Sequence, residues 1–138
     1  MAEVFAGFVV GFALSIAVAP LGAILLVRSN DRTGIAQRIA PEGTSIAALS
    51  MVVHFAAFLV LTMLGLVLGI MLAGIEARRP AGGIGSPNVV YTLLILALTA
   101  VIAIPPMAVP GLRRYACVGA ITFAIAFGWA MPWLASLA

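Results

Sequence analysis

Charge is scarce in this sequence, and lysine is absent from it. Only 8% of the 138 residues are charged, whereas a soluble domain carries about 25%. The seven basic residues are all arginines, and they stand against four acidic residues. Such a composition cannot cover a globular surface in water, so it excludes a soluble enzyme and a disordered chain. It also excludes a nucleic-acid-binding domain, which needs basic residues clustered on one face.

The residues that usually carry chemistry are equally rare. The chain has one histidine, His54, and one cysteine, Cys117. Cys117 has no second cysteine for an intrachain disulfide and is expected to pack as a small apolar residue. Paired carboxylates for acid–base catalysis, a Ser-His-Asp set and a Cys/His cluster with metal-binding spacing are missing from the sequence. We therefore predict that the chain is not an enzyme.

Long apolar runs are what the sequence has in abundance. Hydrophobic residues make up 64% of the chain, and the mean hydropathy is +1.27. Four runs, at about residues 4–27, 45–75, 89–107 and 115–137, contain no Asp, Glu, Asn, Gln, Lys or Arg. Each is close to the roughly 20 residues that a helix needs to cross the hydrocarbon of a bilayer. The sequence therefore predicts an all-α polytopic membrane protein. It would form one domain over residues 1–138, a four-transmembrane-helix bundle with short loops at 28–44, 76–88 and 105–114.

A few residues mark where these helices should bend, start or stop. Pro20 removes a backbone donor and is expected to kink the first helix. Asp31 is expected to cap a short interfacial helix in the first loop. Thr44 or Ser45 should cap the second long helix. The third run should stop at Pro105, because the proline ring interrupts helical hydrogen bonding.

Arginines at the ends of the runs predict the orientation of the chain. The first and third loops hold five of them, and the second loop holds Arg78 and Arg79. Because basic loops tend to stay in the cytoplasm, we predict an integral protein of a prokaryotic cytoplasmic membrane with both termini outside. The five arginines are also expected to meet lipid headgroups. They are Arg28, Arg32, Arg38, Arg113 and Arg114.

Small residues repeat at every fourth position in three of the runs. Such stripes let helix backbones approach closely, which is how membrane helices associate. Three long stripes offer more contact surface than a four-helix bundle needs, so we expect at least one to face another polypeptide. The stripes are Gly7, Gly11 and Ser15; Gly65, Gly69 and Ala73; and Ala116, Ala120, Ala124 and Gly128.

Hydroxyl side chains add mild polarity to the runs. In membrane helices such hydroxyls commonly bond to the carbonyl of residue i−4 in their own helix. We expect this arrangement, and not a polar pathway, for the set of Thr62, Tyr91, Thr92, Thr99 and Thr122.

His54 is the one side chain inside the runs that can carry a charge near neutral pH. At 100° per residue it shares a face of the second helix with small and polar residues, including Ser50 and Gly65. The imidazole should therefore point toward a protein neighbour. Its expected role is a hydrogen bond to Ser50, a backbone carbonyl or a partner helix, or else ligation of a tetrapyrrole, through haem iron or the magnesium of a chlorophyll. A role in transport or gating is the third interpretation.

The shortage of polar groups and the abundance of packing surface favour one function. We expect a non-catalytic integral membrane subunit that packs against and stabilises a larger, energy-transducing membrane complex and offers His54 to a haem or chlorophyll. Its expected partners are other integral membrane subunits and the lipid bilayer, with structural lipid bound and no nucleic acid. The alternative is a small homo-oligomeric transporter or channel for a weakly polar solute, with a path between protomers around His54, Thr62 and Pro20.

Overall fold

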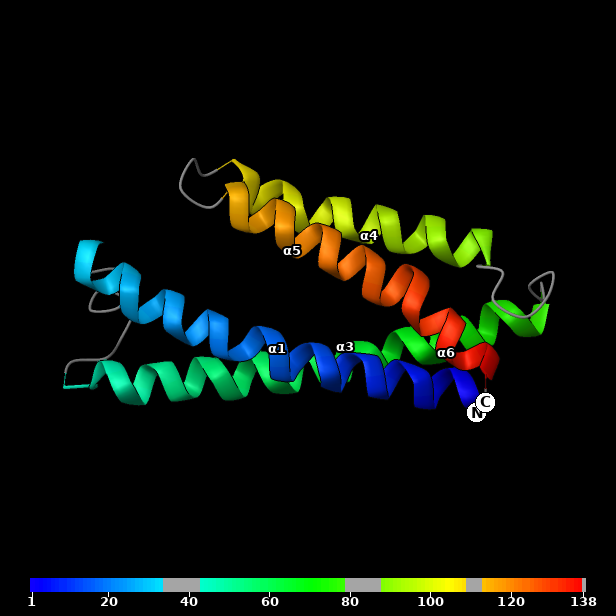
Figure 1. Ribbon diagram of the computed structural model, residues 1–138, viewed down its shortest axis with the longest axis horizontal. Coiled ribbons are helices and arrows are strands. Elements are labelled where there is room, and N and C mark those ends of the chain that lie inside the picture. Colours follow the sequence, from blue (N-terminus) through cyan, green and yellow to red (C-terminus); the bar gives the residue numbers. More distant parts are fainter. Residues whose placement is uncertain (34–42, 79–87, 109–112, 138) are drawn as a thin grey trace. The chain divides into compact units, whose positions relative to one another are not determined.

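The computed structural model describes residues 1–33, 43–78, 88–108 and 113–137, and these are almost entirely helical. Helix α1 covers Ala2–Thr33, α3 covers Ile46–Arg78 and α4 covers Val89–Met107. The last helical stretch consists of α5 at Arg113–Ile125, a π-helical turn, η1, at Ala126–Ala130, and α6 at Met131–Leu137 (Figure 1). No strand occurs within the described ranges, and the predicted all-α class is confirmed.

Three of the helical stretches are long and apolar enough to cross a membrane. They are Ala2–Ile24 in α1, Ile46–Arg78 in α3, and Arg113–Leu137, which joins α5, η1 and α6. The apolar part of α4, Val89–Pro105, is shorter. Helices of membrane-spanning length are therefore confirmed for three of the four runs, and the four-span bundle stays a prediction.

Helix α1 continues beyond the end expected for its apolar run. The run ends near Val27, whereas the helix ends at Thr33. No proline or glycine lies between these two positions, so the backbone keeps its helical hydrogen bonds after the side chains turn polar. Asp31 is therefore an internal residue of α1 and does not cap a new helix. The short helix expected after it falls on residues 34–42, outside the described ranges.

Helices α3 and α4 each begin with a capping side chain. The backbone N–H of Ala48 donates to Ser45 Oγ over 3.1 Å, which confirms the cap expected there. Asn88 has the same role before α4, because its Oδ1 accepts from the N–H groups of Val90 and Tyr91 at 3.2 and 3.4 Å. Both caps satisfy donors that the first turn of a helix leaves without an intrahelical partner.

Helix α4 passes through its prolines instead of stopping at Pro105, and it ends at Met107. The fixed φ of proline, near −65°, is itself helical, so the ring removes a hydrogen bond without forcing the backbone out of the helix. The N–H of Ala108 then bonds to the carbonyls of Ile104 and Pro105, at 3.3 and 3.2 Å, and closes the last turn.

The chain divides into two compact units. The first consists of Met1–Val10 and Gly65–Ala138, and the second of Gly11–Leu64. In the first unit, α4 and the α5–η1–α6 stretch lie side by side as a hairpin (Figure 1). Its largest fully buried side chains come from α3, α4, η1 and α6. They are Leu68, Leu72, Tyr91, Ile95, Phe127 and Met131.

The second unit is built from the remaining parts of α1 and α3. Ser15 and Ala19 of α1 are fully buried, and Thr62 of α3 is nearly so. The rings of Phe12 and Phe58 meet edge-to-face with 5.6 Å between their centroids. Small and hydroxyl side chains therefore form the buried contact, with aromatic rings beside it.

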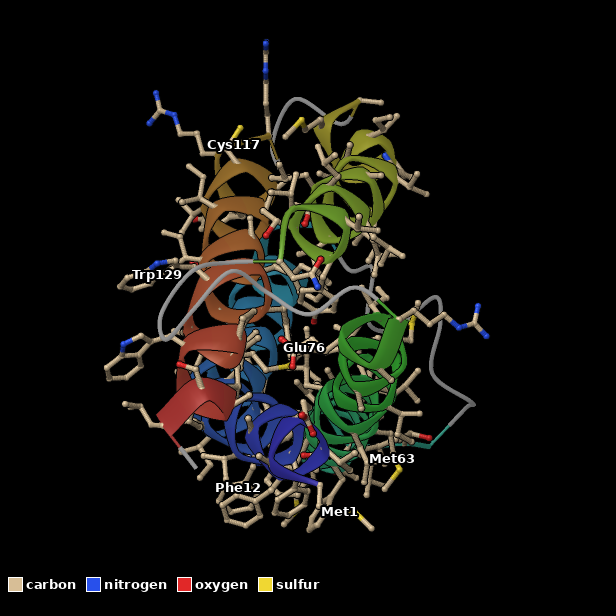
Figure 2. The ribbon with its side chains drawn as sticks, turned by 90° about the vertical axis from the view of Figure 1, so that its right-hand side faces the viewer. Met1, Phe12, Met63, Glu76, Cys117 and Trp129 are labelled. Carbon is tan, nitrogen blue, oxygen red and sulfur yellow. The ribbon has the colours of Figure 1, made fainter. Side chains whose placement is uncertain are left out.

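The outward faces of the helices are apolar. Large exposed hydrophobic side chains occur on every described helix, and Phe55 in α3 and Val118 in α5, for example, are 63% and 65% exposed. Met63 and Trp129 project away from their helices (Figure 2). Soluble monomers rarely expose contiguous apolar patches larger than a few hundred Å², so these faces are compatible with a membrane protein.

Candidate functional site

His54 lies in the part of α3 that belongs to the second unit. Its side chain is partly exposed, and its ring meets that of the neighbouring Phe55 edge-on, with 6.2 Å between centroids. The Ser50 hydroxyl donates to the Ala47 carbonyl over 2.8 Å, so it does not donate to the imidazole of His54. His54 stays the candidate axial ligand of the chain.

In the first unit, α1 crosses α3 through glycine-to-glycine contacts. A Cβ placed on Gly7 would collide with the Gly65 carbonyl oxygen and lie 2.8 Å from Gly69 Cα. A Cβ on Gly69 would lie 2.6 Å from the Glu3 carbonyl oxygen and 2.9 Å from Val4 Cα. Because the obstructing atoms are backbone atoms, only glycine fits at these two positions. The glycines of the first two stripes therefore meet each other within this chain.

In the second unit, the last member of the first stripe joins α1 to α3 through hydroxyl groups. Ser15 Oγ donates to the Phe12 carbonyl over 2.7 Å. Thr62 Oγ1 donates to Ser15 Oγ at 3.5 Å. Gly11, the middle member of the stripe, is buried. The prediction that Thr62 bonds within its own helix is therefore wrong, because its hydroxyl donates to α1 of the same chain.

The stripe of the last run faces α4. A Cβ on Gly128 would stand 3.5 Å from Ile95 Cγ2, an ordinary van der Waals distance. Ala116 and Ala120 line a pocket that α5 shares with α4. Ala124, and Ala73 of the second stripe, are partly buried. Members of all three stripes are therefore engaged within the chain, and the stripes alone do not indicate a second polypeptide.

Pro132 accounts for the π-helical turn before it. Proline has no N–H to offer the Gly128 carbonyl, and its ring would crowd that oxygen in a regular α-helix. The helix widens instead, and the Met131 N–H bonds to the carbonyl of Ala126, one residue further back than in an α-helix. Such π-bulges are a known way for a helix to accommodate an interrupted hydrogen-bond ladder.

Helix α4 supplies donors to this turn. Thr92 Oγ1 donates to the Gly128 carbonyl over 3.4 Å, at the oxygen that Pro132 leaves without its helical partner. The fully buried Tyr91 directs its hydroxyl to Met131 Sδ, 3.7 Å away. The prediction that the Tyr91 and Thr92 hydroxyls bond within their own helix is therefore wrong, although the spacing of Gly128 and Pro132 is a usable signal for these interhelical bonds.

The hydroxyls of Thr99 and Thr122 behave as predicted. Thr99 Oγ1 donates to the Ile95 carbonyl over 2.7 Å, and Thr122 Oγ1 donates to the Val118 carbonyl over 2.9 Å. Both bonds reach the i−4 residue of the same helix. The polar atoms of these side chains are therefore turned toward their own backbone.

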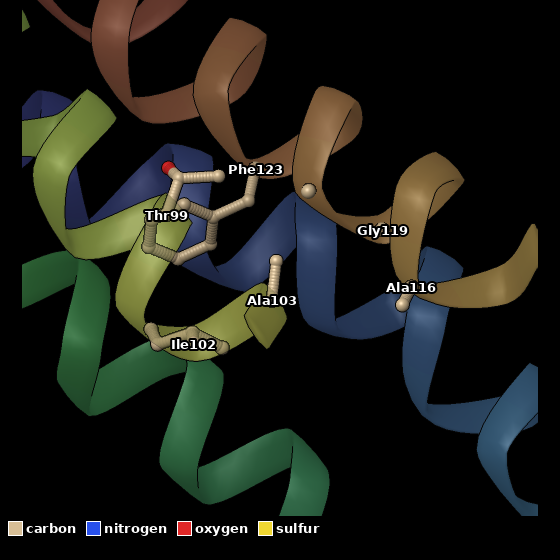
Figure 3. Close-up of a pocket in the computed structure, with 7 residues that line it drawn as sticks. Thr99, Ile102, Ala103, Ala116, Gly119 and Phe123 are labelled. Atoms are coloured by element: carbon tan, nitrogen blue, oxygen red, sulfur yellow. The ribbon is translucent and has the colours of Figure 1, made fainter. Parts of the chain in front are cut away.

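A pocket of about 230 Å³ lies between α4 and α5 (Figure 3). It is in the half of the hairpin next to Met107 and Arg113, and small side chains from both helices leave its space open. A Cβ on Gly119 would meet nothing within 4 Å. The lining consists of Thr99, Ile102 and Ala103 from α4 and Ala116, Gly119, Ala120 and Phe123 from α5. Because the Thr99 hydroxyl is bonded to a carbonyl, the pocket is apolar.

Four of the five arginines expected at the headgroups lie at helix ends. Arg113 and Arg114 are the first two residues of α5, and both are exposed. Arg28 and Arg32 lie in the last turns of α1. Arg38 falls outside the described ranges. The two arginines of α5 therefore lie near the pocket in sequence, beginning three residues before Ala116.

No cluster of three or more His, Cys, Asp or Glu side chains suited to a metal ion occurs among the described residues. No family model matches this chain, and no curated protein or solved structure is significantly similar to it.

Proposed function

We propose that this chain is a non-catalytic integral membrane subunit that packs against and stabilises a larger, energy-transducing membrane complex. The observation that carries the proposal is the contrast between the buried side chains and the outward-facing side chains of the helices. Buried hydroxyls, such as those of Ser15, Thr62 and Thr99, donate to atoms of the same chain. The outward faces carry large apolar side chains.

This arrangement suits contact with lipid and with the helices of other subunits. In hydrocarbon a polar group finds no water, so an unpaired hydroxyl is costly there. By bonding its hydroxyls internally, the chain leaves apolar atoms at its surface. Membrane helices associate through close packing of such surfaces, and partner subunits are the proposed occupants of part of them.

We include α4 as the fourth span of this subunit. Its 19 residues correspond to roughly 29 Å of helix at about 1.5 Å per residue. That length is close to the hydrocarbon thickness of about 30 Å, and the pairing of α4 with α5 supports a hairpin that crosses the membrane twice. With four spans, the distribution of the arginines favours an orientation in the cytoplasmic membrane in which both termini lie outside the cell.

His54 is the proposed point of contact with a tetrapyrrole. Its imidazole is partly exposed beside the ring of Phe55, in a helix that otherwise carries no ionisable side chain between Ile46 and Ile75. An imidazole nitrogen is a common axial ligand of haem iron. A single histidine gives one axial position, so a second would come from another subunit.

The decisive experiment is purification from native membranes in a mild detergent, with mass spectrometry of the accompanying polypeptides and an absorbance scan of the same fraction. We expect co-purifying integral membrane subunits and a tetrapyrrole spectrum. The spectrum should shift or vanish in His54→Leu. It should stay unchanged in Ser50→Ala, a matched control one turn away whose hydroxyl is bonded to Ala47.

The other outcomes separate the alternatives. Co-purifying subunits without visible absorbance would refute tetrapyrrole binding at His54 and support the role as a subunit. A colourless homo-oligomer would overturn the proposal and favour the transporter or channel, which should then move a weakly polar solute when reconstituted alone.

A further inference from the structure

We propose that the pocket between α4 and α5 binds one acyl chain of an anionic phospholipid whose phosphate is held by Arg113. This site depends on membrane insertion alone. It does not depend on partner subunits or on a ligand at His54, so it goes beyond the function proposed above.

The pocket has the size and chemistry to take up part of an acyl chain. An apolar cavity of about 150 Å³ is large enough to take up benzene, and this pocket measures about 230 Å³. Its walls are apolar side chains, and its one hydroxyl, on Thr99, is bonded to the Ile95 carbonyl (Figure 3). Hydrocarbon fills such a space without leaving any polar group unpaired.

One of the residues that line the pocket is an exposed glycine, Gly119. A Cβ on Gly119 would meet no atom within 4 Å, in contrast to the tight glycines at the crossing of α1 and α3. Gly119 is therefore not needed for the approach of two helices. Its effect is to leave room beside Ala116 and Ala120, which line the same pocket.

Arg113 extends the pocket-lining face toward the end of the helix. Residues 113, 116 and 120 follow the i, i+3, i+7 spacing of one helical face, and Ala116 and Ala120 both line the pocket. Arg114, the next residue, is rotated by about 100° from that face. The guanidinium group of Arg113 matches phosphate oxygens in charge and in bidentate geometry.

The order of these parts matches the orientation of a lipid in a bilayer. Arg113 is the first residue of α5, and Phe123 lies ten residues further along the helix, roughly 15 Å along its axis. A phosphate at Arg113 places the acyl chain alongside the helix, past Gly119 and toward Phe123. The positive charge of Arg113 at the helix end and the apolar pocket beside the helix together favour an anionic phospholipid.

The test measures which lipid the full chain retains. The protein is purified in mild detergent and equilibrated with equal amounts of phosphatidylglycerol and phosphatidylcholine that carry the same acyl chains. Native mass spectrometry then counts the lipids bound. We expect one phosphatidylglycerol retained in preference to phosphatidylcholine.

Two pairs of variants locate the site. Gly119→Leu fills the pocket and should lose both lipids, whereas Val118→Leu, a neighbouring exposed position, should behave as the unchanged protein. Arg113→Gln should keep a lipid but lower the preference for phosphatidylglycerol by roughly fivefold, the factor expected for one arginine near an anionic surface. Arg114→Gln removes the same charge and should keep most of the preference.

Three results would overturn the proposal. They are equal retention of the two lipids by the unchanged protein, equal effects of Gly119→Leu and Val118→Leu, and equal effects of the two arginine variants. Circular dichroism checks that each variant is helical, and Gly119→Val replaces Gly119→Leu if the larger side chain prevents folding. A chain that purifies alone and colourless can still bind lipid, so failure of the proposed function is distinguishable from failure here.

Discussion

Replacement of Gly69 by alanine should force α1 and α3 apart in the first unit, whereas the same change at Gly74 should not. An added Cβ at residue 69 lies 2.6 Å from the Glu3 carbonyl oxygen, and one at residue 74 meets nothing within 4 Å. Both glycines belong to α3, so both changes gain the same helix propensity, about 0.5–1 kcal/mol. The difference between the two variants therefore reports the helix crossing alone.

The magnitude follows from the contact distance. Ordinary Cβ contacts begin at about 3.4 Å, so the two backbones must part by roughly 0.8 Å to admit the methyl group. A gap of about 0.5–1 Å forfeits a quarter to a half of the dispersion energy of each contact, and overpacking costs about 1–3 kcal/mol. We expect Gly69→Ala to lower the free energy of unfolding by roughly 1–2 kcal/mol and Gly74→Ala to raise it by about 0.5–1 kcal/mol.

The free energy of unfolding is measured in mild detergent by titration with a denaturing detergent, followed by far-ultraviolet circular dichroism. A matched pair in α1 repeats the comparison, because Gly7 is as crowded as Gly69 and Gly22 is as open as Gly74. Equal stabilities of Gly69→Ala and Gly74→Ala would refute the reasoning, since they would show that the crossing has room for a side chain.

Three further predictions concern hydrogen bonds at helix ends and at the π-helical turn. Thr92→Val removes the donor to the Gly128 carbonyl and should lower the free energy of unfolding by about 0.5–1.5 kcal/mol. Pro132→Ala restores an N–H four residues after Gly128, so the turn should become α-helical and Thr92→Val should then cost less, a coupling that a double-mutant cycle measures. Ser45→Ala removes the cap that accepts from the Ala48 N–H and should destabilise the chain by about 1 kcal/mol. Amide hydrogen exchange should show the first turn of α3 opening more readily in that variant, and unchanged exchange there would contradict the capping role.

Sequence reasoning succeeded where a feature depends on residues close together in the chain. The cap at Ser45 and the hydroxyl bonds of Thr99 and Thr122 each involve partners within four residues. Such contacts follow from the helical repeat itself. The membrane-length apolar helices were predictable for the same reason, because hydropathy is a property of one segment.

The sequence alone could not show which of the predicted helix faces contact each other. The stripe that begins at Gly7 and the stripe that begins at Gly65 mark surfaces that allow close approach, but they do not say which surface approaches which. The structure pairs them with each other. The bond from Thr92 to Gly128 joins helices that are far apart in sequence, so it depends on the register of the hairpin.

The ends of helices were the other weak point of the sequence reasoning. Hydropathy marks where a chain leaves hydrocarbon, whereas a helix ends where its backbone loses hydrogen bonds. Helix α1 therefore continues through Asp31 to Thr33, and α4 continues through Pro105 to Met107.

The π-helical turn at Ala126–Ala130 shifts the phase of the last helix. A turn that takes one extra residue rotates every later side chain by about 100° relative to an unbroken α-helix. The buried residues of this segment are Phe127 and Gly128 within the turn and Met131 and Pro132 directly after it. Pro132 and the extra residue of the turn therefore depend on each other. A version of the chain without Pro132 should accept the deletion of one residue from the turn and still present the same face after it, whereas the present chain should not.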